Sequence, residues 1–103
     1  EGFEILALNW RYKRAEIDIV ARESGVLVFT EVKTRAGTSF GRPEEMVDRR
    51  KRRLLIDAAM AYMRSIGYEW EIRFDIVAVI GSPGGACDIR LYRDAFFPGL
   101  DYC

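Results

Sequence analysis

The stretch EIDIVARESGVLVFTEVKT, residues 16–34, decides the fold of this chain. Two runs rich in β-branched and other apolar residues flank Ser24-Gly25, a pair of residues typical of a tight hairpin turn. We therefore predict two antiparallel strands, over residues 16–23 and 26–34.

A two-residue turn also fixes the register of this hairpin. Asp18 then faces Glu31 and Glu16 faces Lys33, and alternation places all four side chains on one side of the sheet. The opposite side is apolar and carries Ile17, Ile19, Val28 and Val32. Two opposed carboxylates repel, and the repulsion grows on a central strand because the dielectric is low there. A positive group must therefore offset the repulsion.

A divalent cation suits this position, because Mg²⁺ prefers carboxylate oxygens and keeps several waters. We expect Mg²⁺ (or Mn²⁺) as the cofactor, with Asp18 and Glu31 as its ligands and Lys33 orienting a bound water. The alternative is a surface ion pair between Glu16 and Lys33, with Asp18 protonated or solvated.

The remaining elements follow from turn and helix signals. A helix is expected to begin at Pro43, with Glu44 and Glu45 complementing its dipole, and to end at Gly67. The continuous apolar run Ile76–Ile80 predicts a strand that is buried on both faces. Further strands are expected over residues 3–10, 73–80 and 88–92, with a basic loop at residues 11–14.

The predicted order is β-β-β-α-β-β, which indicates an α/β fold with a mixed sheet. The helix is long enough to serve as the crossover between two parallel strands and to pack on the sheet. No linker divides the chain, so residues 1–103 are expected to form a single domain. Because the chain begins almost inside a strand, we also expect a preceding element that this sequence lacks.

Composition excludes several classes of protein. Half of the 103 residues are apolar and 31% are charged, with 16 basic and 16 acidic side chains, which excludes intrinsic disorder. No apolar run approaches the roughly 20 residues of a membrane span. The sequence has no histidine, which excludes Ser–His, Cys–His and histidine–zinc mechanisms. With only two cysteines, a reducing, cytoplasmic location is expected.

Four segments resemble the bacterial YraN-like family, which is assigned to the PD-(D/E)XK nuclease superfamily close to Holliday-junction resolvases. They are residues 16–22, 28–35, 40–45 and 73–79, and the resemblance covers nearly the whole chain. It implies a restriction-endonuclease-like mixed β-sheet flanked by helices, preceded by an N-terminal helix that carries a glutamate near the site.

The resemblance also implies a role for each site residue. Asp18 matches the metal-binding aspartate, Glu31 the second carboxylate and Lys33 the motif lysine, while Glu16 matches the acidic residue two places before the aspartate. Two departures are visible: no proline precedes Asp18, and Ala15 stands where the family usually has glycine.

Bases that could hold nucleic acid gather at the start of the predicted helix, in the unbroken run Arg49–Arg53. Lys51 and Arg52 continue the apolar stripe of the helix, so its first turns are expected to overhang a cleft instead of the core. The alternative is a solvated helix surface with pairs to Asp48. The candidate nucleic-acid-binding residues are Lys51, Arg52, Arg49, Arg35 and Arg14.

These patterns predict a metal-dependent endonuclease that hydrolyses phosphodiester bonds in nucleic acid. DNA is the expected substrate, and the sequence does not distinguish branched from linear forms. RNA is the alternative substrate. A branched substrate would favour a two-fold homodimer. The rival hypotheses are a catalytically inactive nucleic-acid-binding module and a protein-interaction domain of the same fold.

Overall fold

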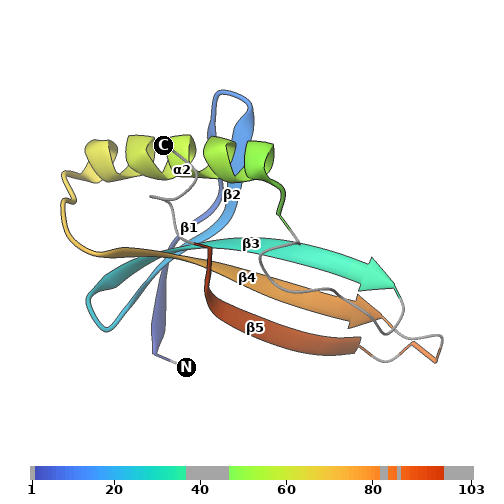
Figure 1. Ribbon diagram of the computed structural model, residues 1–103. Coiled ribbons are helices and arrows are strands. Elements are labelled where there is room, and N and C mark those ends of the chain that lie inside the picture. Colours follow the sequence, from blue (N-terminus) through green and yellow to red (C-terminus); the bar gives the residue numbers. More distant parts are fainter. Residues whose placement is uncertain (1, 37–46, 82–83, 86, 97–103) are drawn as a thin grey trace.

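A computed structural model describes residues 2–36, 47–81, 84–85 and 87–96 of the chain (Figure 1). Its elements confirm the predicted order β-β-β-α-β-β. They are β1 (Phe3–Tyr12), β2 (Ala15–Glu23), β3 (Val26–Ala36), α2 (Arg49–Ile66), β4 (Ile72–Gly81) and β5 (Cys87–Phe96). Within the described residues, no helix is both long and apolar enough to span a membrane.

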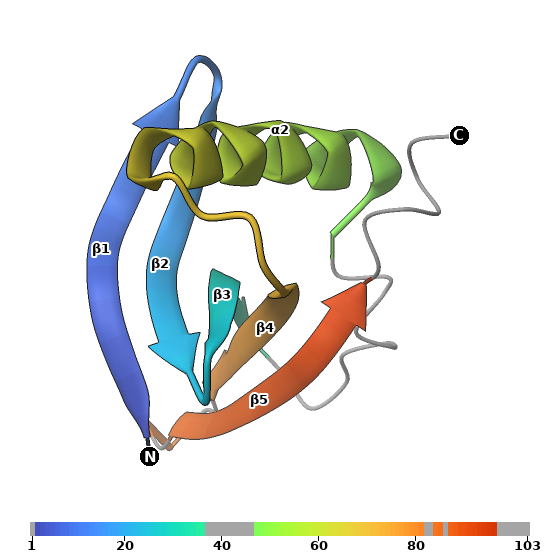
Figure 2. The ribbon, with the colours of Figure 1, turned by 90° about the vertical axis from the view of Figure 1, so that its left-hand side faces the viewer.

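The five strands form one mixed sheet in the order β1-β2-β3-β4-β5. Only β3 and β4 are parallel, and α2 is the crossover between them, as parallel strands require. The helix lies across one face of the sheet and packs mainly on β2 and β1 (Figure 2). The sheet is strongly twisted, so the far ends of β3 and β4 extend beyond the helix (Figure 1).

The hairpin that joins β2 and β3 has the predicted turn and register. Ser24 has a φ of 50° and Gly25 a φ of 80°, the positive values that a type I′ turn requires. Backbone pairing runs from Glu23 opposite Val26 to Ile19 opposite Thr30, as the two-residue turn predicts. The hairpin register could therefore be read from two turn residues.

The start of the helix differs from the prediction. α2 begins at Arg49, because Asp48 is its N-cap and accepts a hydrogen bond from the backbone N–H of Lys51 at 2.8 Å. The predicted start at Pro43, with Glu44 and Glu45, lies outside the described residues. The predicted end is confirmed, since Gly67 adopts the left-handed conformation with a φ of 67°.

The core lies between α2 and the sheet. Tyr62 meets the ring of Phe29 edge to face at 6.1 Å, and the ring of Phe74 stacks on that of Phe96 at 4.8 Å. The helix contributes Leu55, Ile56, Ala58, Ala59 and Tyr62 to this core. Ile17 and Val20 both lie in this core. The prediction placed Ile17 on the opposite side of the sheet, but the alternation of side chains between the two faces breaks between these residues in the twisted β2.

The sheet face that points away from α2 is only partly covered. Val77 and Val79 are half-buried, so the predicted burial of β4 on both faces holds fully only for its helix-facing residues. Their partners on β5 are more open: Leu91 is 39% exposed and Ile89 68% exposed. Nearer the β2–β3 turn, this face carries an ionic network between β2, β4 and β5.

Candidate active site

The two predicted carboxylate ligands lie where β2 and β3 separate. Backbone pairing of these strands stops at Ile19 and Thr30, one residue before Asp18 on β2. Beyond that point the side chain of Asp18 replaces the backbone: its Oδ2 accepts a hydrogen bond from the N–H of Val32 at 2.8 Å. The carboxylate of Asp18 is thus held against β3, next to the neighbouring Glu31.

Glu31 is a buried carboxylate, only 7% exposed, and two ammonium groups approach it. Its Oε2 lies 3.5 Å from Nζ of Lys33 and 3.8 Å from Nζ of Lys51. Burial and the charge of Asp18 raise the pKa of Glu31, and the two lysines oppose that shift without cancelling it. The two carboxylates are therefore close enough to repel each other.

Lys51 reaches this site from the first turn of α2. Its ammonium contacts Glu31, so this side chain faces the sheet, whereas the cleft expected beneath the first turns stays a prediction. The N-cap hydrogen bond from Lys51 N–H to Asp48 fixes the same turn of backbone. We predicted Lys51 only as a nucleic-acid contact, and its position on the apolar stripe was the signal that it faces the sheet.

Arg52 has a different environment from the one that we predicted. Its Nε donates a hydrogen bond to the carbonyl of Val47 at 2.8 Å, and its guanidinium lies 5.8 Å from the centre of the Phe96 ring. The side chain is half-buried by these contacts. In this structure Arg52 supports the start of the helix and the end of the core.

Glu16 is paired with β1 and not with Lys33. Its carboxylate lies 3.9 Å from the guanidinium of Arg11, the residue opposite it in the β1–β2 ladder. Because β2 and β3 separate after Ile19, the register that would have set Glu16 against Lys33 does not continue. Lys33 pairs with Glu31 on its own strand instead.

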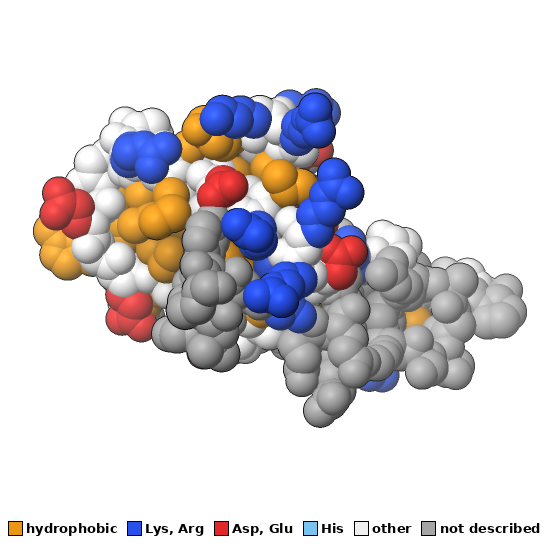
Figure 3. Space-filling view, turned by 45° about the horizontal axis from the view of Figure 1, so that its top comes forward, with side chains coloured by type: hydrophobic (Ala, Val, Ile, Leu, Met, Phe, Trp, Pro, Cys, Tyr) orange, Lys and Arg blue, Asp and Glu red, His pale blue; other side chains and the backbone are white. Residues whose placement is uncertain are grey.

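Two of the other predicted bases are exposed at the surface. Arg14 is exposed in the turn between β1 and β2, and Arg49 is exposed at the start of α2. Figure 3 shows lysine and arginine side chains gathered on the face of the molecule that carries the helix. The backbone of Arg35 belongs to β3, but its side chain lies outside the described part of the chain.

The chemistry of the site fits a small divalent cation. Mg²⁺ is typically held by one or two carboxylates, with water and substrate phosphate completing its ligands. Asp18 and Glu31 offer that number of carboxylates, and a cation would offset both the burial and the charge of Asp18, which together raise the pKa of Glu31. Among the described residues no group of three or more acidic, histidine or cysteine side chains is placed to share a metal.

Comparison with known proteins places this site within a protein family. The profile described as "Uncharacterised protein family UPF0102" matches residues 1–79. The chain belongs to the UPF0102 family. This confirms the resemblance to the YraN-like family, and the four residues of the candidate site (Asp18, Glu31, Lys33 and Lys51) lie in the matched range.

Relatives in the UPF0102 family come from several organisms. A UPF0102 protein of Porphyromonas gingivalis is 44% identical over 100 residues, which are 97% of this chain and 74% of that protein. Those of Flavobacterium psychrophilum and Symbiobacterium thermophilum are 41% identical over 97 residues and 44% identical over 96. The matches cover 94% and 92% of this chain, and 81% of each relative.

Proposed function

We propose that this UPF0102 protein is a metal-dependent endonuclease that hydrolyses phosphodiester bonds in nucleic acid, with DNA as the expected substrate. The observation that carries the proposal is the meeting of Asp18 and Glu31 where β2 and β3 separate, with Lys33 beside Glu31. The spacing of these three residues also supports membership of the PD-(D/E)XK superfamily, as the sequence resemblance implies.

Asp18 and Glu31 would hold the cation, either Mg²⁺ or Mn²⁺. A bound divalent cation polarises the phosphate and makes its water a stronger nucleophile at neutral pH. The protein's part is to fix its ligands in advance: the N–H of Val32 orients Asp18, and burial between strand and helix holds Glu31.

The two lysines supply positive charge beside these ligands. Lys33 is half-buried, which limits its mobility and suits it to orient the attacking water or hold a phosphate oxygen. Lys51 adds a second ammonium from the other side of the site, because it projects from α2 and not from the sheet. Together they favour a substrate whose reacting group carries negative charge that builds up during the reaction.

A cleavage assay with labelled nucleic acids tests this proposal. Linear duplex DNA, single-stranded DNA, a four-way junction and duplex RNA are incubated with Mg²⁺ or Mn²⁺, and with EDTA. We expect metal-dependent cleavage that falls about 100-fold or more in Asp18→Asn and in Lys33→Ala, since each removes a group that acts in the transition state.

The matched control is Asp88→Asn, which removes an exposed carboxylate that pairs with Arg90 on β5. This variant should cleave at the parent rate. Equal cleavage by the parent and by Asp18→Asn, purified in the same way, would show that the activity comes from a contaminant and would overturn the proposal. Metal-independent binding with no cleavage of any substrate would instead favour the inactive nucleic-acid-binding module.

The preferred substrate also bears on assembly. If the four-way junction is cut in preference to linear duplex, we propose a two-fold homodimer, because the two strands to be cut are related by symmetry. Light scattering on the protein with and without the junction measures this state. A monomer bound to a junction that it cuts on both strands would contradict this arrangement.

A further inference from the structure

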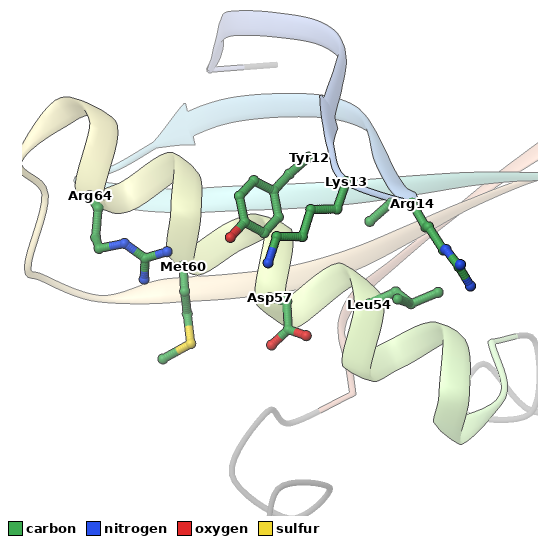
Figure 4. A pocket seen from close by; sticks show the side chains of 8 residues that line it. Tyr12, Lys13, Arg14, Leu54, Asp57, Met60 and Arg64 are labelled. Carbon is green, nitrogen blue, oxygen red and sulfur yellow. The ribbon is translucent and has the colours of Figure 1, made fainter.

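A groove runs along the side of α2 that faces away from the sheet. It consists of two adjoining cavities that share Leu54 and Asp57. The first has a volume of about 450 Å³ and lies between the β1–β2 turn and the helix. Figure 4 shows the side chains of Tyr12 and Lys13 facing those of the helix across this cavity. We call the two cavities together the outer groove of α2.

Positive charge dominates the outer groove. Six of its lining residues are basic, and all six are exposed, whereas Asp57 is the one acidic residue among those that line it. The bases are Lys13, Arg14, Arg49, Arg50, Arg53 and Arg64. Five of these six lie in the two basic segments predicted from the sequence, residues 11–14 and 49–53; only Arg64 lies outside them, and it joins the others because it lies on the same side of the helix.

The outer groove is separate from the candidate active site. On a helix, residues three or four apart share a face, so Arg50, Arg53, Asp57 and Arg64 lie together on the solvent side. Lys51 lies on the sheet side, where it contacts Glu31. The helix therefore carries one lysine toward the carboxylates and a row of arginines away from them.

We infer that the outer groove binds the sugar–phosphate backbone of nucleic acid, outside the point of cleavage. The inference rests on the proposed function, because that function makes nucleic acid the partner. From Arg49 to Arg64 the helix rises about 22 Å. That length corresponds to about six phosphates on one strand of a duplex, since successive phosphates are about 3.4 Å apart along the axis.

The number and exposure of these bases suit non-specific backbone contacts. Exposed arginines and lysines bind phosphates without reading base sequence, and they displace the counterions of the nucleic acid. An interface for a folded protein would instead need an apolar centre with few charges. In the outer groove, charged side chains outnumber the apolar ones that reach the solvent, such as Met60.

Salt-dependent binding tests the inference without any cleavage. A fluorescent 20-base-pair duplex is titrated with protein in EDTA, at salt concentrations from 50 to 200 mM. The test variant is Arg14→Gln/Arg50→Gln, which removes one base from each cavity. We expect at least tenfold weaker binding at 100 mM salt. The slope of log K against log salt should fall by about 2, because two phosphate contacts are lost.

The matched control is Arg22→Gln, which changes an exposed arginine beside Trp70, outside the outer groove. Its affinity and slope should equal those of the parent, and both variants should melt at the parent temperature. An unchanged slope in the double variant would overturn the inference, as would salt-insensitive binding by the parent. Equally tight binding of a poly-glutamate peptide would overturn it as well, by indicating an acidic protein as the partner.

The design separates this inference from the proposed function. The binding titration runs in EDTA with variants of the outer groove alone, so its outcome does not depend on the metal that cleavage requires. If no substrate is cleaved but the double variant still shows a smaller slope of log K against log salt, nucleic-acid binding by the outer groove is supported and the nuclease proposal fails. If cleavage is found but the slope of the double variant equals that of the parent, the nuclease proposal is supported and the inference about the outer groove fails.

Discussion

Glu31 carries a charge that lowers the stability of the folded protein. Its pKa is raised by burial and by Asp18, so its charged form is less favourable in the folded protein than in the unfolded chain. Below the usual pKa of a glutamate, both states hold the proton and no cost arises. As the pH rises from that value to the raised pKa, the unfolded chain loses its proton before the folded protein does. The folded state therefore becomes less stable over this range.

Glu31→Gln should therefore raise the melting temperature of the metal-free protein at pH 7. The gain should shrink as the pH falls toward 4, where the parent carboxyl is protonated in both states. Thermal melts in EDTA across this range measure it. A variant less stable than the parent at pH 7 would show that the pairs with Lys33 and Lys51 outweigh the cost of burial.

The helix and the hairpin show how much of a single element can be predicted from its sequence. Ser24 and Gly25 predicted the hairpin register because turn geometry is local. The end of the β2–β3 ladder could not be predicted, because there a side chain, Asp18, takes the place of a backbone partner. The helix was predicted to start at Pro43, because proline is typical of a first helical turn. The observed start depends on a hydrogen bond from the backbone to the side chain of Asp48, which the sequence pattern did not reveal.

Asp48→Ala should destabilise the protein by about 1 kcal/mol, because it removes the N-cap of α2. In a domain of this size such a loss lowers the melting temperature by about 4–8 °C. Cleavage should fall too, because the cap fixes the backbone of Lys51. Asp48→Asn keeps a capping side chain and should restore both. If Asp48→Asn is as unstable as Asp48→Ala, charge and not capping is the cause.

Across the whole molecule, the sheet is held together on both faces by different means. One face packs on α2, whereas the other carries the ionic network in which Arg73 on β4 binds Glu23 on β2 at 2.7 Å and Asp75 at 2.8 Å. Arg93 on β5 binds the same Glu23 at 3.0 Å. Sequence pattern predicted the strands but not this network, because Glu23 is distant in the chain from both Arg73 and Arg93.

The network predicts a pH dependence opposite to that of Glu31. The hydrogen bond from Arg73 is the main cause that lowers the pKa of Glu23. Glu23 therefore adds stability above its usual pKa, and this is lost as the pH falls through the lowered value. Glu23→Gln should melt at a lower temperature than the parent at pH 7 and match it in strong acid. A difference that persists in strong acid would mean that packing, not charge, is responsible.

The hydrogen bond between Val32 and Asp18 has a spectroscopic consequence. The amide proton of Val32 is bound to the carboxylate proposed as a cation ligand, so its NMR resonance reports directly on that carboxylate. Titration with Mg²⁺ would shift this signal without any substrate present. Amides in the last turn of α2, at the opposite end of the helix from Lys51, would provide the internal reference.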